Sequence, residues 1–354
     1  MDKPVYGREN WIDVARCLAI YAVYIGHFGA DAGRLSPFVF SFHIPLFFLL
    51  AGCTFFFEKE KHYGMFVWKK ICSILVPMWI FSLLAIGLYV FQYGITGQQL
   101  KEFLWLIIKG NIRNTFISNS LWFLSCLFVI EIVFKLLCYA RSKIVLLVFC
   151  LGCFFVANCA FAVPPVSNPR WIYNIDSALH YAVFFGSGYV LYPFLSELMK
   201  LDTGVKKRIF FISMLLSGIF TALVYVDPDS VYQLMYRVPC SFLLTYLLTP
   251  MLISTFIVLA SKVLENAVLL ANIGKETLFL CGNEYFLIIL LPEIVGILGF
   301  EMHMTSPVQV ILWGCVKLGF GYFLLIPAER KIVEWLQNLF CQKRSKCPQA
   351  FSNR

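Results

Sequence analysis

The chain has 354 residues, of which 60% are hydrophobic and 14% are charged, and its mean hydropathy is +0.77. A soluble domain of this size needs far more polar surface, so the composition excludes a soluble globular protein and predicts an all-α, polytopic membrane helix bundle. The net charge of +9 fits cytoplasmic loops rich in Lys and Arg, so the expected partners of the surface are membrane lipids rather than nucleic acid.

About ten apolar stretches are long enough to cross a bilayer. The polar segment before the first stretch has no signal-peptide pattern, so we expect the first stretch to be a membrane span. In chain order the predicted spans lie near 11–28, 38–57, 71–93, 121–139, 144–163, 177–195, 208–226, 239–260, 277–298 and 307–328.

The basic residues indicate the orientation of these spans. If the N-terminus is cytoplasmic, it holds, together with the even-numbered loops and the C-terminal tail, about 20 of the 29 Lys and Arg residues. The opposite loops hold six, and three lie within spans. This imbalance predicts that both termini are cytoplasmic, with a membrane domain over 1–335 and a basic cytoplasmic tail over 336–354.

The first span carries two polar residues inside an apolar run, in RCLAIYAVYIGH from Arg16 to His27. Eleven residues at 100° each place the two side chains about 20° apart around a helix, and separate them by roughly 16 Å along it. Asp13 lies one turn before Arg16 and is positioned to pair with it. The predicted orientation places Arg16 in the cytoplasmic half and His27 in the outer half. Their shared face indicates a polar track through the membrane.

Further polar residues begin the later spans at their outer ends. They are His43 at span two, Asn119 and Trp122 at span four, and His180 at span six. Each one alone is more typical of an interfacial anchor, whereas three histidines in the same half favour a shared site. In the outer loop before span four, LKEFLWLIIKG has the 3.6-residue period of an amphipathic helix lying at the interface.

Two small-residue patterns favour packing over chemistry. Cys150 and Cys153 lie in a predicted span, where cysteine is expected as a small buried apolar residue rather than as half of a metal or redox pair. Gly186 and Gly188 in span six predict a close contact between helices. No ligand spacing along the chain suggests a metal site.

The last two spans contain a potential ion pair. Glu284 lies well inside span nine and Lys317 inside span ten, at similar depth. The pair is compatible both with a salt bridge that pins the helices and with a catalytic role, and the sequence alone leaves both open.

Five motifs in order resemble those of the acyltransferase family 3 membrane proteins, in particular a fucose 4-O-acetylase-like branch. They are R-x10-H from Arg16 to His27, FHIPLFFLLAGCTF from Phe42 to Phe55, KKICSILVP from Lys69 to Pro77, LWFL from Leu121 to Leu124, and IGKETLFLCGNE from Ile273 to Glu284. The chain departs from the family at four positions. Ala51 stands where the family usually has serine. Glu284 stands where many members have histidine, Cys281 where they have tyrosine, and Leu127 where another branch has glutamate.

The resemblance implies a bacterial inner (plasma) membrane enzyme with many membrane passes. It is expected to transfer an acyl group, usually acetyl, from cytoplasmic acyl-CoA to a hydroxyl of a cell-surface polysaccharide or lipid-linked sugar. Arg16, Lys69 and Lys70 are then the candidates for binding the CoA phosphates, because guanidinium and ammonium groups match phosphate oxygens. His27 is the candidate general base or acyl carrier.

The remaining polar residues are candidates for the acceptor side of the site. His43 is a second catalytic candidate, and Asn119, Trp122, His180 and Glu284 are candidates for binding the acceptor. A transporter or flippase for a glycan, without acyl-transfer chemistry, is the alternative function, although no inverted repeat or pair of matched broken helices is visible. The sequence is compatible with a homo-oligomer but does not determine the oligomeric state.

Overall fold

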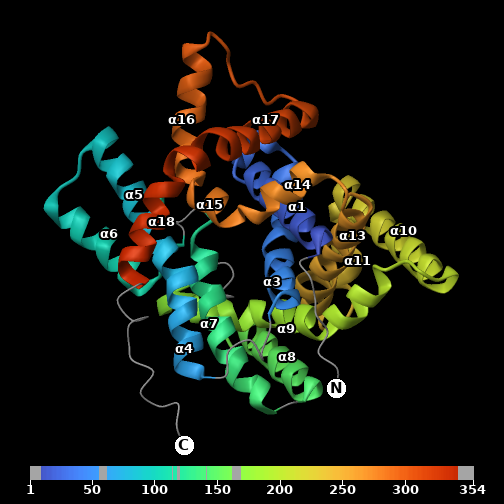
Figure 1. The fold of residues 1–354 in the computed structure, drawn as a ribbon. Coiled ribbons are helices and arrows are strands. Elements are labelled where there is room, and N and C mark those ends of the chain that lie inside the picture. Colours follow the sequence, from blue (N-terminus) through green and yellow to red (C-terminus); the bar gives the residue numbers. More distant parts are fainter. Residues whose placement is uncertain are drawn as a thin grey trace, which may run out of the picture.

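The computed structural model describes residues 9–55, 62–113, 115–117, 120–140, 142–161 and 169–341. These residues form helices and contain no strand, which confirms the predicted all-α bundle (Figure 1). The first half of the chain contains α1 (Asn10–Gly26), α2 (Leu35–Phe40), α3 (His43–Cys53), α4 (Tyr63–Lys70), α5 (Val76–Tyr93), α6 (Gly97–Lys109), α7 (Trp122–Leu137), α8 (Lys143–Cys159) and α9 (Ile175–Leu198). The second half contains α10 (Gly204–Val226), α11 (Pro228–Tyr236), α12 (Ser241–Leu243), α13 (Thr249–Val263), α14 (Val268–Lys275), α15 (Thr277–Gly282), α16 (Glu284–Ile297), α17 (Pro307–Phe320) and α18 (Ile326–Cys341).

Short stretches of other helix types join several of these elements. Three π-helical stretches continue one α-helix into the next, namely η3 (Ile71–Leu75), η6 (Leu244–Leu248) and η7 (Gly321–Leu325). Three 3₁₀ turns lie in the connections, namely η1 (Gly29–Ala32), η4 (Cys138–Ala140) and η5 (Ile172–Asn174).

Every stretch predicted to span the membrane contains helix. Six helical segments in the described part of the chain are long and apolar enough to cross a bilayer, namely Leu35–Cys53, Tyr63–Tyr93, Trp122–Ala140, Gly204–Val226, Ser241–Val263 and Pro307–Cys341. The remaining predicted spans correspond to α1, to α8, to α9 and to α15 with α16. α18 continues to Cys341, beyond residue 335, and the rest of the predicted tail lies outside the described residues.

The ninth predicted span is not one helix. α15 ends at Gly282 and α16 begins at Glu284, with Asn283 between them. The Asn283 amide donates to the carboxylate of Glu329 on α18, and a side chain at Gly282 would collide with the Phe81 ring on α5. Contacts with neighbouring helices therefore set this break, which places Glu284 in the first turn of α16.

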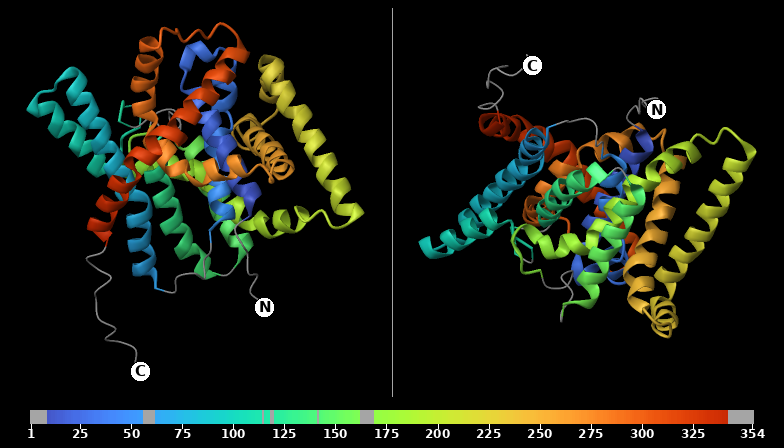
Figure 2. Two further views of the ribbon diagram at one scale, coloured as in Figure 1. Left: turned by 45° about the horizontal axis from the view of Figure 1, so that its top comes forward. Right: turned by 90° about the horizontal axis from the view of Figure 1, so that it is seen from below.

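α1 is the central element of the bundle. It packs against α2, α3, α13, α14, α15 and α17 in the middle of the bundle (Figure 1). Most of its side chains are buried. α5 and α6 form a hairpin on one side of the molecule, and α10 lies on the other side (Figure 2). α6 covers the predicted amphipathic segment, and it begins with a capping box between Thr96 and Gln99. Because α1 packs against helices on several sides, a polar residue on α1 is surrounded by protein.

Small residues bring α9 close to its neighbours, as predicted from Gly186 and Gly188. A Cβ at Gly188 would collide with the backbone of Leu49 on α3, and one at Gly186 would lie 2.8 Å from Cys150 Sγ on α8. Cys150 is buried and Cys153 is half-buried, and both are free thiols. These contacts confirm that this part of the chain uses its small residues for packing.

A disulfide joins Cys72 in η3 to Cys341 at the end of α18. The Gln337 side chain donates to the Cys72 carbonyl oxygen nearby, at 2.8 Å. The two contacts hold the end of α18 against the π-helical stretch that follows Lys70. The cysteine pattern of the sequence does not predict this pairing.

Candidate active site

The two polar residues of the first span lie at different places on α1. Arg16 is inside the helix and has a side chain that is 25% exposed. α1 ends at Gly26, so His27 is the residue that follows its last turn. The His27 side chain is 19% exposed, which leaves part of its ring accessible.

His27 contacts a buried carboxylate that is 257 residues away in sequence. Nδ1 of His27 lies against Oε1 of Glu284, whose side chain is 1% exposed. The hydroxyl of Ser120 donates to Oε2, the other oxygen of the same carboxylate. Both oxygens of Glu284 therefore have a hydrogen-bond partner, and one partner is the ring of His27.

The predicted pair between Glu284 and Lys317 is confirmed. Lys317 Nζ lies 3.9 Å from Glu284 Oε1, and the lysine side chain is 2% exposed. The ammonium group also lies over the rings of Tyr24 and Phe28, at 4.9 Å and 5.2 Å from their centroids. α1, α16 and α17 thus meet around a buried cluster of polar side chains.

His43 lies close to His27, with one aromatic ring between them. The Phe40 ring centroid is 5.8 Å from that of His27 and 5.0 Å from that of His43. His43 is buried in the first turn of α3, and its Nδ1 lies 2.6 Å from the carbonyl oxygen of Val39. Because a carbonyl only accepts, Nδ1 carries the proton and Nε2 of a neutral His43 is an acceptor.

The structure places His180 among packed side chains between α8 and α9. Asn158 Nδ2 donates to its Nδ1 at 3.1 Å, and the Phe154 ring lies 4.9 Å away. Trp122 is 6% exposed, and the Arg113 guanidinium covers one face of its ring at 3.9 Å. These contacts do not join either residue directly to His27. Asn119 lies outside the described residues.

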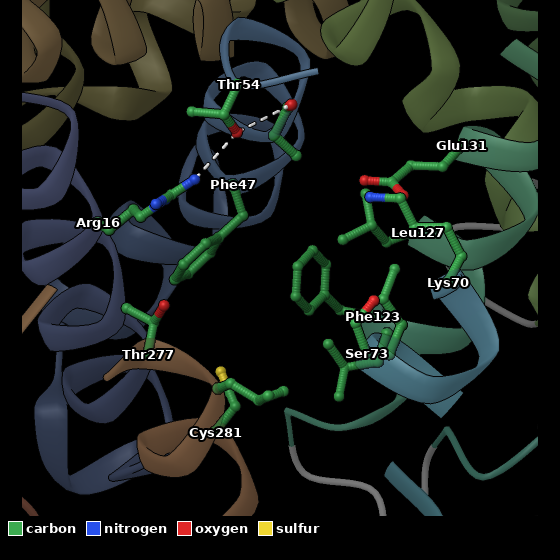
Figure 3. A pocket seen from close by; sticks show the side chains of 14 residues that line it. Arg16, Phe47, Thr54, Lys70, Ser73, Phe123, Leu127, Glu131, Thr277 and Cys281 are labelled. Atoms are coloured by element: carbon green, nitrogen blue, oxygen red, sulfur yellow. Dashed lines mark hydrogen bonds and ion pairs between the residues drawn. The ribbon is translucent and has the colours of Figure 1, made fainter. Parts of the chain in front are cut away.

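A cavity of about 290 Å³ opens between α1, α3, α7, α15 and the α4–η3 segment (Figure 3). Arg16 and Lys70, two of the three predicted phosphate ligands, line it on opposite sides. Its other walls are formed by Phe47, Ala51, Thr54, Ser73, Ile74, Phe123, Leu124, Leu127, Glu131, Thr277, Leu278 and Cys281. Lys69 follows Trp68 on α4 and does not belong to this wall.

Both cations in the cavity are held by neighbours. Arg16 donates to Asp13 at 3.3 Å, the predicted partner, and to the Thr54 hydroxyl at 3.0 Å. Lys70 Nζ lies 2.5 Å from Glu131 Oε2, and its side chain is 26% exposed. Both side chains are partly exposed and line the cavity.

The cavity approaches the His27 cluster along three different elements. Phe47 follows His43 by four residues, Phe123 follows Ser120 by three, and Cys281 precedes Glu284 by three. His43 and Phe47 lie in one helix, α3, where four residues make about one turn, or roughly 5 Å along the axis. The other two pairs are three residues apart across the start of α7 and across the break at Asn283. The cavity is thus only a few residues along the chain from groups that contact or surround His27.

Three contributing residues were not found by sequence reasoning. Ser120 and Thr54 have no sequence signal, because a single hydroxyl is common in membrane helices. Glu131 has one, since a carboxylate within an apolar helix is costly and usually faces protein. It lies one turn beyond Leu127, the position at which another branch of the family has glutamate. Among the described residues no group of three or more His, Cys, Asp or Glu side chains could hold a metal ion.

A comparison with protein-family models identifies one match. The model of family 3 of the acyltransferases, described as an acyltransferase domain, matches residues 9–325. The matched range includes Arg16, His27, Glu284 and Lys317. No curated protein and no solved structure matches the chain.

Proposed function

Because the chain belongs to acyltransferase family 3, a family of membrane acyltransferases, we propose that it transfers an acetyl group from acetyl-CoA to a sugar hydroxyl. The acceptor is a cell-surface polysaccharide or a lipid-linked sugar at the outer face of a bacterial inner membrane. The observation that carries the proposal is the contact between His27 and Glu284, which lies outside the wall of a cavity lined by Arg16 and Lys70 but three residues from one of its lining residues, Cys281.

The donor is proposed to bind with its phosphates at Arg16 and Lys70. These two side chains supply positive charge on opposite sides of the cavity, and the rings of Phe47 and Phe123 lie between them (Figure 3). CoA joins charged phosphates to a thin, uncharged pantetheine arm, so it could place its phosphates at the cations and its arm along the rings. The roughly 16 Å between Arg16 and His27 along α1 is a length that such an arm can bridge.

His27 is proposed to act as the general base. With Nδ1 hydrogen-bonded to a carboxylate, the ring keeps its proton on Nδ1 and presents the lone pair of Nε2. In the described part of the chain nothing hydrogen-bonds Nε2, and the side chain is partly exposed. Glu284 thereby acts on His27, in place of the acceptor-binding role expected from the sequence.

The reaction balances with these groups alone. The acceptor hydroxyl transfers its proton to His27 Nε2 as its oxygen attacks the thioester carbonyl. The carbon–sulfur bond then breaks, and the imidazolium returns the proton to the departing CoA thiolate. The products are the O-acyl sugar and free CoA. His43 is proposed to orient the sugar by accepting a hydrogen bond at Nε2 from a neighbouring hydroxyl, because the reacting hydroxyl donates its only proton to His27.

The test uses the purified chain in lipid nanodiscs with acetyl-CoA and p-nitrophenyl glycosides as acceptors. Release of CoA thiol and acetylation of the glycoside, detected by mass spectrometry, are expected for the wild type and absent for His27→Ala. His303→Ala is the matched control, because this histidine side chain is 67% exposed and pairs with Glu301. Full activity of His27→Ala would overturn the assignment. Movement of a glycan across the membrane without thioester consumption would favour a transporter.

A further inference from the structure

Lys317 is a buried cation that has no hydrogen-bond acceptor in the part of the chain that the structure describes. Its side chain is 2% exposed, and its Nζ makes no hydrogen bond within the described residues. Burying a charge costs several kcal/mol unless a partner or a polar environment compensates for it. The nearest opposite charge is the Glu284 oxygen at 3.9 Å, the same oxygen that His27 contacts.

The packing of α17 brings Lys317 close to α1. Gly314 lies one turn before Lys317, where a Cβ would lie 3.0 Å from the Tyr21 ring. Gly321 follows by four residues, where a Cβ would lie 3.2 Å from Leu280 and 3.6 Å from the Tyr24 hydroxyl. Small residues on both sides of Lys317 therefore allow its helix to approach α1 and α15.

The partners of Glu284 show what the lysine adds. Ser120 and His27 already occupy the two oxygens, so Lys317 is not needed to satisfy them. Without the lysine, the carboxylate and a neutral His27 would form a buried site with a net negative charge. With the lysine the site is neutral as a whole, and a neutral buried site is far less costly.

We propose that Lys317 is a positioning residue for catalysis: its charge keeps Glu284 ionised opposite a neutral His27. This inference rests on the proposed function, in which neutral His27 is the base. Lys317 itself touches neither donor nor acceptor in this scheme. Its role is electrostatic and is exerted through Glu284.

The proposal predicts a pH effect with a definite sign. Removal of the lysine leaves the Glu284–His27 pair with a net negative charge, so the pair retains an extra proton up to a higher pH. The proton must leave before His27 can act as a base, and the acidic limb of the pH–activity profile therefore moves to higher pH. The other titratable groups that face the pair are Tyr24 from α1, His43 from α3 and Cys281 from α15. Behind them, Glu329 from α18 faces Tyr24, and Arg113 from the loop before α7 faces His43.

The experiment compares Lys317→Met and Lys317→Gln with Lys317→Arg, which keeps the charge. For the two neutral variants we expect the acidic limb of kcat/KM to move up by about one pH unit, with the KM for acetyl-CoA unchanged. Lys317→Arg should keep the acidic limb of kcat/KM at the same pH as the wild type. The matched control is Lys262→Met, since Lys262 pairs with Glu265 at 2.6 Å on α13. A lower kcat with an unshifted limb would mean that the lysine only pins helices, and would overturn the proposal.

A second measurement does not depend on acyl transfer. Diethyl pyrocarbonate modifies neutral imidazole, so its rate of reaction at His27, read by peptide mass spectrometry, reports the proton directly. We expect the pH midpoint of the modification at His27 to be higher in Lys317→Met than in the wild type. The Glu284→Gln variant and the Glu284→Gln/Lys317→Met double variant should have the same midpoint as each other. An equal rise in both backgrounds would show that the lysine does not act through Glu284. This readout stands even if His27→Ala proves active, which would refute only the proposed function.

Discussion

The Arg16–Lys70 end of the site and the His27–Glu284 end hold their charges in different ways. Arg16 and Lys70 are each about a quarter exposed, line a cavity, and pair with Asp13 and Glu131 respectively. Glu284 and Lys317 are at most 2% exposed, and both Glu284 oxygens are already bonded. The first arrangement suits a ligand that arrives and leaves, and the second suits a group that must stay fixed during a reaction. The predictions below test this contrast.

The largest effect is expected at the fixed end. Glu284→Gln keeps the shape of the side chain but lets the amide present an N–H or a weaker acceptor to His27 Nδ1. The imidazole then loses its enforced tautomer and the stabilisation of its protonated form, so kcat should fall by about 10³-fold. The KM for acetyl-CoA should stay within about twofold, because Glu284 lies outside the cavity wall. Steady-state CoA release measures both, and a rise in KM with constant kcat would place Glu284 in donor binding.

A steric block of the cavity should have the next largest effect. Ala51 lines the cavity, and Ala51→Phe would place a ring where the donor arm is proposed to run. Misplacement of the thioester by about 1 Å is enough to lower kcat/KM by about 10²-fold. The matched control is Ala222→Phe on α10, where the side chain is exposed. An unchanged kcat/KM for Ala51→Phe would show that the donor does not enter this cavity.

Arg16→Lys should have a smaller and more selective effect. It keeps the charge next to Asp13 but loses the planar fork that matches phosphate oxygens. Loss of one charged hydrogen bond predicts a KM for acetyl-CoA that is about tenfold higher. The KM for S-acetyl-N-acetylcysteamine, a thioester without phosphates, should not change. An equal rise for both donors would mean that Arg16 supports the helix rather than the phosphates.

The sequence predicted the helices and the local ion pairs well. Hydropathy located helix in every predicted span, because a chain that crosses a bilayer must satisfy its backbone within the helix. Asp13 and Arg16 pair because they are one helical turn apart, and Glu284 pairs with Lys317 because both lie at a similar depth. The five motifs also indicated the family, which the model match over residues 9–325 confirms. The fucose 4-O-acetylase-like branch and the cytoplasmic placement of both termini stay predictions.

Which helices are neighbours could not be predicted in the same way. A helix in a membrane has no apolar face that identifies its partner, because lipid and protein are similarly apolar. The contact of His27 with Glu284 therefore has no local signal, and neither does the break at Asn283 that places Glu284 in the first turn of α16. The sequence placed His180 in one site with His27 and His43 only because all three are predicted to lie in the outer half of the membrane. The structure shows that His180 packs instead against Asn158 on α8.

The smallest effect is expected where a carboxylate competes with the donor. Lys70 Nζ lies 2.5 Å from Glu131, so a phosphate that binds Lys70 must replace or share this partner. Glu131→Gln keeps a polar group of the same shape and removes the negative charge beside the cavity. Partly exposed ion pairs are worth about 0.2–1 kcal/mol, so the KM for acetyl-CoA should fall by about two- to fivefold. S-acetyl-N-acetylcysteamine should show no change, and added salt should reduce the difference between the variant and the wild type. Glu334→Gln is the control, since this exposed carboxylate lies 3.7 Å from Arg330 on α18. If the KM rises instead, Glu131 serves to hold Lys70 in place, and this end of the site is as fixed as the His27 end.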